Sequence, residues 1–125
     1  MQELTLSYEE NIRYIDGIIR VRDNFDIIKK TLVIADSELT LYYIDGFVKD
    51  GAMQKLMIYL LSLKELKEVG ADTAAVFVNE HVPYVEAEAT ESVDQMILML
   101  MSGASLVLGQ HFGKSAIIVD ARTYP

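Results

Sequence analysis

The feature that most constrains this chain is an uncharged stretch from Gln95 to Gly113, which includes the apolar run Met96–Met101. A helix that spans a membrane needs about 20 predominantly apolar residues in succession. Here Ser102-Gly103 interrupts the apolar run, and the apolar character ends before Gln110-His111. The stretch therefore predicts a buried helix, a turn and a buried strand instead of a membrane span.

The composition is that of a folded, acidic domain. Of the 125 residues, 51% are hydrophobic and 24% are charged, and the formal net charge is −8. Because about 100–150 residues is the commonest domain size, we expect residues 1–125 to form one domain. The acidic balance and the scattered lysines and arginines argue against binding to nucleic acid or to an anionic membrane surface. The sequence contains no cysteine, which excludes disulfides and thiolate chemistry, and it begins without the pattern of a secretory signal.

The N-terminal part predicts two helices and a hairpin. Ser7 opens a capping box of the form S-x-x-E, and isoleucines follow it at helical spacing. A second, short helix is expected to begin near Asp23 and to include Ile27-Ile28. The β-rich runs 32–34 and 39–44 then predict a hairpin.

Two further helices and a single strand are expected next. The helices are predicted over residues 53–63 and 71–81, although Val76–Val78 would equally suit a strand. Pro83 disfavours helix in the residue before it. The alternation that follows predicts a half-buried strand over residues 84–88.

The C-terminal part predicts a helix and a second hairpin. Thr90 or Ser92 is expected to cap the helix that contains residues 96–101, which we expect to be buried on every side. Strands over 105–108 and 116–119 flank a loop bounded by glycines. The expected core includes Ile44, Leu56, Leu60, Ile97, Leu100, Val107, Ile117 and Val119.

The predicted fold class is α/β (α+β), a mixed β-sheet with packed helices. The expected order of elements is α-α-β-β-α-α-β-α-β-β, and a chain that combines hairpins with strands reached through helices favours a mixed sheet. We identify no internal repeat.

The candidate chemical groups do not form a recognisable catalytic or metal site. Neither His81 nor His111 has metal-ligand spacing with a carboxylate. The carboxylate pairs Glu86/Glu88 and Glu91/Asp94 fit an outward strand face and the first turn of a helix. No nucleophile elbow or phosphate-binding glycine pattern is present in the sequence. The sequence therefore predicts a protein that is not an enzyme and that binds no cofactor or metal.

Two other features have ordinary structural interpretations. The methionines of residues 96–101 would suit an adaptable binding surface, although a core position is the commoner role at this helical spacing. Asp16-Gly17 is interpreted as a turn or helix-end feature.

Two segments resemble the GerA spore germination family. Leu41–Asp50 is similar to the family's strand and Ile-Asp-Gly turn, and Ile97–Pro125 is similar to its helix, Ser-Gly, strand, turn and final strand. Val82–Glu86 and the ending Arg122–Pro125 resemble the stage V sporulation AF branch more than the nutrient-receptor A subunits. The turn at Gln110–Gly113 departs from the family, which usually has an acidic residue and a glycine there.

The resemblance implies a non-catalytic domain on the cytosolic face of the spore inner membrane. Its expected role is regulation or assembly of a germination-related ion channel or receptor complex. Its expected partners are other subunits of that complex, its own membrane domain and further copies in a homo-oligomer, without membrane insertion of this segment. The alternative is a small-ligand sensor with a crevice at the strand ends. The residues expected to form a contact surface are Tyr84, Glu86, Gln110, His111 and Lys114.

Overall fold

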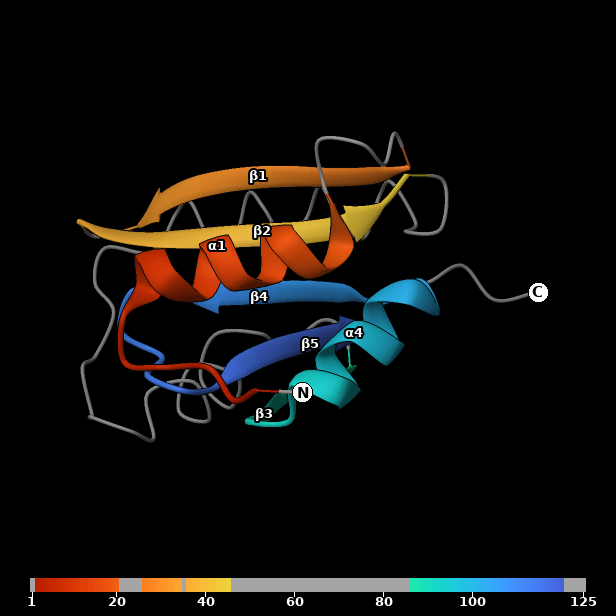
Figure 1. Ribbon diagram of the computed structural model, residues 1–125. Helices are drawn as coiled ribbons and strands as arrows, with labels where there is room; N and C mark the ends of the chain where they lie inside the picture. The colour runs from red at the N-terminus through yellow and green to blue at the C-terminus, as the bar shows by residue number, and fades with distance from the viewer. Residues whose placement is uncertain (1, 21–25, 35, 46–85, 121–125) are drawn as a thin grey trace.

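The computed structural model describes residues 2–20, 26–34, 36–45 and 86–120. The elements are α1 (Tyr8–Ile19), β1 (Ile27–Ile34), β2 (Ser37–Ile44), β3 (Glu86–Thr90), α4 (Val93–Met101), β4 (Ser105–Gly109) and β5 (Ala116–Asp120). Both helices lie on the same face of one five-stranded sheet (Figure 1). The predicted α/β (α+β) class is confirmed, and the helices expected at 53–63 and 71–81 lie outside the described residues.

The strands follow the order β1-β2-β4-β5-β3, and each neighbouring pair is antiparallel. The parallel pairing expected in a mixed sheet is therefore not found among the described strands. The reason is the position of β5. Strands β3 and β4 are joined through α4 and run in the same direction, but β5 lies between them and pairs with both.

The first hairpin is longer than the sequence predicted. β1 and β2 pair from Ile27↔Ile44 to Ile34↔Ser37. The short helix expected to include Ile27-Ile28 is wrong, because these residues begin β1. Their branched side chains disfavour helix, and β2 supplies a partner for their backbone groups. Asp36 turns the chain with a φ of 66°, in the left-handed region that aspartate adopts more readily than most residues.

The two helices begin with the same set of hydrogen bonds. The cap serine accepts a bond from the backbone N–H three residues later, at 3.3 Å in α1 and 3.1 Å in α4, which confirms the predicted caps. The serine N–H donates to a threonine hydroxyl two residues earlier, at 3.0 Å and 3.1 Å. In a capping box the Glu or Gln side chain accepts directly from the serine N–H. Here the threonine hydroxyl lies between them and donates to that side chain, at 3.4 Å in α1 and 3.0 Å in α4. The residues are Thr5, Ser7 and Glu10 at α1 and Thr90, Ser92 and Gln95 at α4.

The end of α4 is a Schellman motif. The N–H of Gly103 donates to the carbonyl of Leu100 at 3.0 Å, and the N–H of Ala104 donates to that of Met99 at 2.9 Å. Gly103 has a φ of 105°, which glycine adopts without steric cost. This confirms the sequence-based position of the glycine directly after the helix.

Only one side of α4 is buried. Val93, Met96 and Leu100 pack in the core, whereas Leu98 and Met101 are exposed. The prediction that this helix is buried on every side is therefore wrong. The physical reason is that α4 packs against one face of the sheet and its opposite side is the outer surface of the helix layer (Figure 1).

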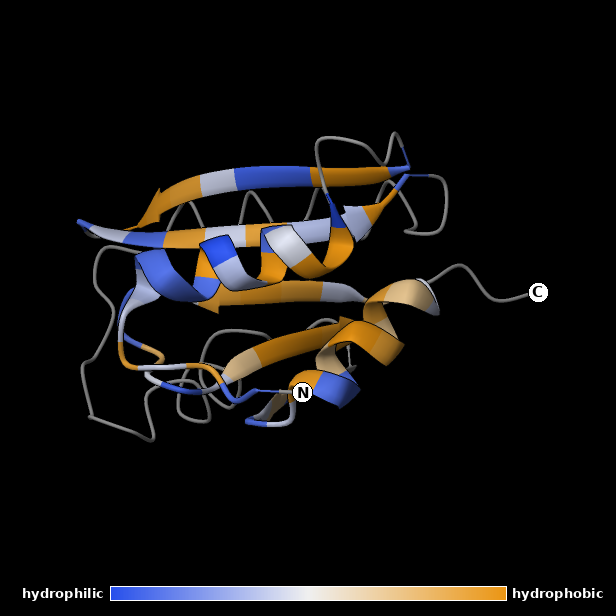
Figure 2. Cartoon of the chain, in the orientation of Figure 1, coloured by the Kyte–Doolittle hydropathy of each residue, from blue (hydrophilic) through white to orange (hydrophobic). Residues whose placement is uncertain are grey.

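Consecutive residues of β4 and β5 are buried, so apolar side chains line both faces of the sheet there. Figure 2 shows that both strands are strongly hydrophobic along their length. Leu106, Leu108 and Ile118 face the two helices. Of the predicted core, the residues that are buried are Leu100, Val107, Ile117 and Val119. Ile44 and Ile97 are half-buried at the margin of the core, and Leu56 and Leu60 lie outside the described residues.

Candidate functional site

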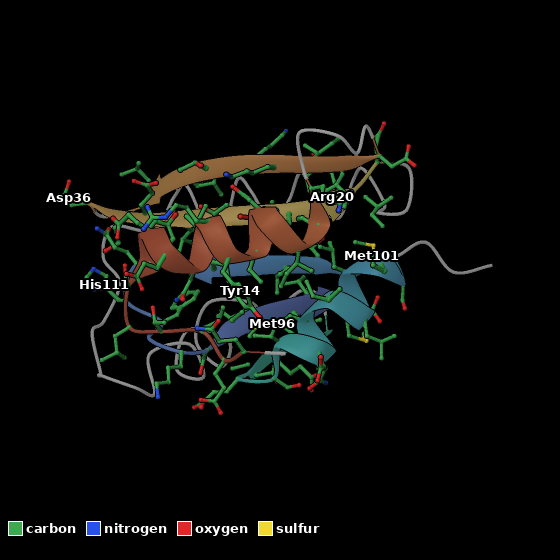
Figure 3. All side chains as sticks on the ribbon, viewed as in Figure 1. Tyr14, Arg20, Asp36, Met96, Met101 and His111 are labelled. Atoms are coloured by element: carbon green, nitrogen blue, oxygen red, sulfur yellow. The ribbon has the colours of Figure 1, made fainter. Side chains whose placement is uncertain are left out.

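The loop between β4 and β5 contains three of the five predicted contact residues: Gln110, His111 and Lys114. It lies at the same end of the sheet as the β1–β2 turn, as the labelled positions of His111 and Asp36 show (Figure 3). Phe112 anchors the loop, because its side chain is buried and its N–H donates to the carbonyl of Gly109 at 3.2 Å. His111 is half-buried and Lys114 is exposed, so the loop presents both to the surface.

Gln110 also completes the sheet. Its backbone N–H donates to the carbonyl of Glu38 at 3.0 Å, and its side-chain Oε1 accepts from the N–H of Glu38 at 3.0 Å. These two bonds extend the β2–β4 pairing by one residue beyond Leu39↔Gly109, with a side-chain amide in place of a backbone carbonyl. A substitution at Gln110 would therefore change the end of the sheet as well as the surface.

The remaining predicted contact residues are not brought to this loop. Glu86 pairs with Asp120 at one end of β5, whereas the loop enters β5 at Ala116. A strand rises by about 3.3 Å per residue, so these two ends lie about 13 Å apart. Tyr84 lies outside the described residues.

Sequence reasoning missed a polar cluster between α1 and the first hairpin. The carboxylate of Asp16 accepts hydrogen bonds from the Tyr42 hydroxyl at 2.8 Å and from the Lys29 ammonium at 2.7 Å. Lys29 Nζ also lies 5.9 Å from the centre of the Tyr42 ring. Asp16 lies in the last turn of α1, near the helix end as Asp-Gly suggested, but its carboxylate is bonded to the first hairpin. Its partners lie 13 and 26 residues away, so no local pattern pointed to them.

A second polar contact joins the start of α1 to β2. The Tyr8 hydroxyl lies 2.5 Å from Thr40 Oγ1 and 3.4 Å from Glu38 Oε1. Burial raises the pKa of Tyr8 to about 12. Burial, followed by the hydrogen bond to Asp16, raises the pKa of Tyr42 further. Both phenols therefore stay protonated at neutral pH, where they act as hydrogen-bond donors that hold α1 on the sheet and not as bases.

One pocket lies where α4 meets β3 and β5. Its volume is about 280 Å³, and Ala87, Glu88, Met99, Ile118 and Asp120 line it. Glu88 Oε1 accepts a hydrogen bond from Gln95 Nε2 at 2.9 Å, which fixes one carboxylate beside the pocket. The arrangement combines an apolar floor with two acidic groups, and it could bind a small cation with an apolar portion.

Within the described ranges, no three His, Asp or Glu side chains are grouped so that they could hold a metal ion. Neither α1 nor α4, the helices of the described part, is long and apolar enough to cross a membrane.

Residues 14–125 match the family model described as the Bacillus/Clostridium GerA spore germination protein. The chain belongs to the GerA family. The resemblance predicted from the sequence is therefore confirmed, and the match extends it to most of the chain, including the second half of α1.

Two known proteins are similar to this GerA chain. It is 26% identical over 116 residues to the Stage V sporulation protein AF of Bacillus subtilis (strain 168), a match that covers 93% of this chain and 23% of that protein. It shares the fold of the N-terminal domain of the A subunit of the Bacillus megaterium spore germinant receptor GerK3, with a TM-score of 0.75 and 18% identity. That match covers 98% of this chain and 49% of the solved one. The chain thus spans about a quarter of the first relative and half of the second.

Proposed function

We propose that this GerA chain is a non-catalytic domain that acts in the regulation or assembly of a germination-related receptor or ion-channel complex. The observation that carries the proposal is the family match over residues 14–125. In this proposal residues 1–125 form the first unit of a longer membrane protein, on the cytosolic face of the spore inner membrane. Its partners are its own membrane domain, other subunits of the complex and further copies of the protein.

The contacts of the polar side chains support a role in binding. Asp16 and Tyr42 hold α1 on the sheet, Tyr8 bonds to Thr40, and Gln110 completes the β2–β4 pairing. Because the polar atoms of these side chains bond to other parts of the domain, they are not directed at a reacting molecule. We therefore assign the function to the surface, and the Gln110–Lys114 loop with its exposed cation is the first candidate contact. Tyr84 and Glu86 form a second, separate candidate.

Charge reversal in germinating spores tests this proposal. Lys114→Glu, introduced into the full-length protein, should slow germination, measured as release of dipicolinate, while the protein level stays constant. Lys30→Glu is the matched control, because Lys30 is an exposed lysine on β1 and not in the loop. Equal dipicolinate release from both variants and wild type would contradict the contact assignment. Turnover of a metabolite by the purified chain would contradict the non-catalytic assignment.

The pocket beside α4 favours one alternative, a small-ligand sensor. Its volume of about 280 Å³ lies just below the range of about 300–1,000 Å³ usual for ligand sites. Glu88 and Asp120 would select a small organic cation. A thermal-shift screen of small ammonium compounds tests this alternative: a compound that stabilises the wild type but not Glu88→Gln would support it.

A further inference from the structure

The outer face of α4 presents apolar side chains to solvent. Leu98 is 65% exposed and Met101 is 43% exposed, and they lie three residues apart on one side of the helix. We call these two residues the α4 patch. Figure 2 shows the strong hydrophobic colouring of this helix, and Figure 3 labels Met101 at its end. Exposed apolar groups that lie together inside a polar rim are typical of sites where another molecule binds.

The rim of the α4 patch is acidic. Among the described residues 86–113 the sequence has four aspartates and glutamates and no lysine or arginine. Within this stretch Glu88, Glu91 and Asp94 are exposed around the N-terminal half of α4. The electrostatic potential beside the α4 patch is therefore negative, so it attracts a cationic partner and repels an anionic one.

We infer that the α4 patch docks a basic amphipathic helix of a partner protein, whose apolar side chains cover Leu98 and Met101 while its lysines or arginines face Glu91 and Asp94. The inference rests on the proposed function, in which the chain acts through protein contacts. The charge pattern decides between occupants. A second copy of this chain would bring acidic rim against acidic rim, and an anionic membrane surface would be repelled in the same way.

The absence of cysteine from the sequence permits a site-specific test. Leu98→Cys and Leu6→Cys each introduce a single thiol, whose rate of maleimide labelling is measured with and without a designed amphipathic helix of leucine and lysine. Leu6 is the matched control, because it is 78% exposed and lies near Glu3, Glu9 and Glu10 in the sequence. We expect the peptide to slow labelling about tenfold at position 98 and to leave position 6 unchanged, as for a site more than nine-tenths occupied.

Binding of the same peptide to neutral polar variants gives an independent readout. Leu98→Gln and Met101→Gln should each raise its dissociation constant about tenfold, which corresponds to about 1.4 kcal/mol, whereas Leu6→Gln should not change it. Both α4 positions are exposed, so circular dichroism should show that the variants fold. A leucine–glutamate peptide should not bind.

Several outcomes would overturn the inference. Equal protection of positions 6 and 98 would indicate non-specific attraction to acidic surface, and equal binding of the two peptides would remove the role of charge. If labelling of Leu98→Cys slows as the protein concentration rises in the absence of peptide, the α4 patch is covered by a second copy of the chain, which contradicts the inference. Failure of the peptide while Lys114→Glu still impairs germination would refute this inference alone and leave the proposed function in place.

Discussion

The Tyr42 hydroxyl donates a 2.8 Å hydrogen bond to the carboxylate of Asp16, and this bond joins the last turn of α1 to strand β2. Tyr42 is fully buried, whereas Asp16 and Lys29 are about one-third exposed. The buried bond and the exposed ion pair therefore contribute unequally to stability, although they share one carboxylate.

Tyr42→Phe and Lys29→Met separate these two contributions. Tyr42→Phe should lower the free energy of unfolding by about 1 kcal/mol, the usual net value of an intramolecular hydrogen bond. Lys29→Met should lower it by less than about 0.5 kcal/mol, because water and salt screen an exposed ion pair. Urea denaturation at low and high salt measures both. A larger loss for Lys29→Met than for Tyr42→Phe would contradict this order.

Leu100 and Leu98 provide a matched comparison on one helix. Leu100→Ala should cost about 2–5 kcal/mol through lost burial and the cavity that remains. Leu98→Ala should change stability by less than about 0.5 kcal/mol, because its side chain faces solvent. Denaturant midpoints of the two variants check this, and an unchanged midpoint for Leu100→Ala would show that the inner side of α4 is not packed as described.

Gly109 and Gly17 should respond in opposite directions to alanine. A Cβ at Gly109 would lie 2.6 Å from the ring of Phe112, which is itself buried, so Gly109→Ala should destabilise by about 1–3 kcal/mol. A Cβ at Gly17 meets nothing within 4 Å, so Gly17→Ala should stabilise α1 by about 0.5–1 kcal/mol. Thermal melting of the pair provides the measurement, and a shift of the same sign in both would refute the argument.

The buried tyrosines predict a loss of stability at high pH. In the unfolded chain a tyrosine loses its proton near its ordinary pKa of 10.0, but burial raises the pKa of Tyr8 to about 12 and that of Tyr42 further. Above pH 10 the unfolded state thus binds fewer protons than the folded state, so the free energy of unfolding falls as the pH rises. The stability that these phenols contribute is complete below pH 10 and is lost as pH rises through about 12 and above.

Phenylalanine variants identify the residues responsible for this pH dependence. Tyr8→Phe and Tyr42→Phe should each reduce the slope of unfolding free energy against pH above 10.0, the ordinary tyrosine value. Urea denaturation at a series of pH values checks the slope. A slope equal to that of wild type in both variants would assign the effect to other groups.

The sequence predicted those parts of the fold that depend on near neighbours. The serine caps, the glycine after α4 and both hairpins follow from residues within a few positions of each other. The start of β1 was mispredicted because pairing of Ile27 with Ile44 outweighs a local helix signal. The exposure of Leu98 depends on which layer is outermost, and a pattern of apolar residues does not contain that information.

The candidate site was predictable only in part, for a similar reason. Gln110 was identified as a loop residue, but its bond to Glu38 crosses 72 positions of sequence. The Asp16 cluster likewise joins three elements, and the local Asp16-Gly17 pattern gave no sign of its partners Lys29 and Tyr42. The repeated T-x-S-x-x-E/Q pattern before α1 and α4 was visible in the sequence, and it would have indicated the shared cap.

The position of β5 between β3 and β4 also sets an order of assembly. β3 precedes α4 and the β4–β5 hairpin in the chain, yet it pairs with β5, so this pairing closes a longer stretch of chain than the β4–β5 hairpin does. Chain segments that wait for a distant partner gain their native contacts late in folding. Residues 86–90 should therefore be the last of the β3–α4–β4–β5 unit to acquire protection from hydrogen exchange during refolding, and the first to lose it when the native sheet opens locally.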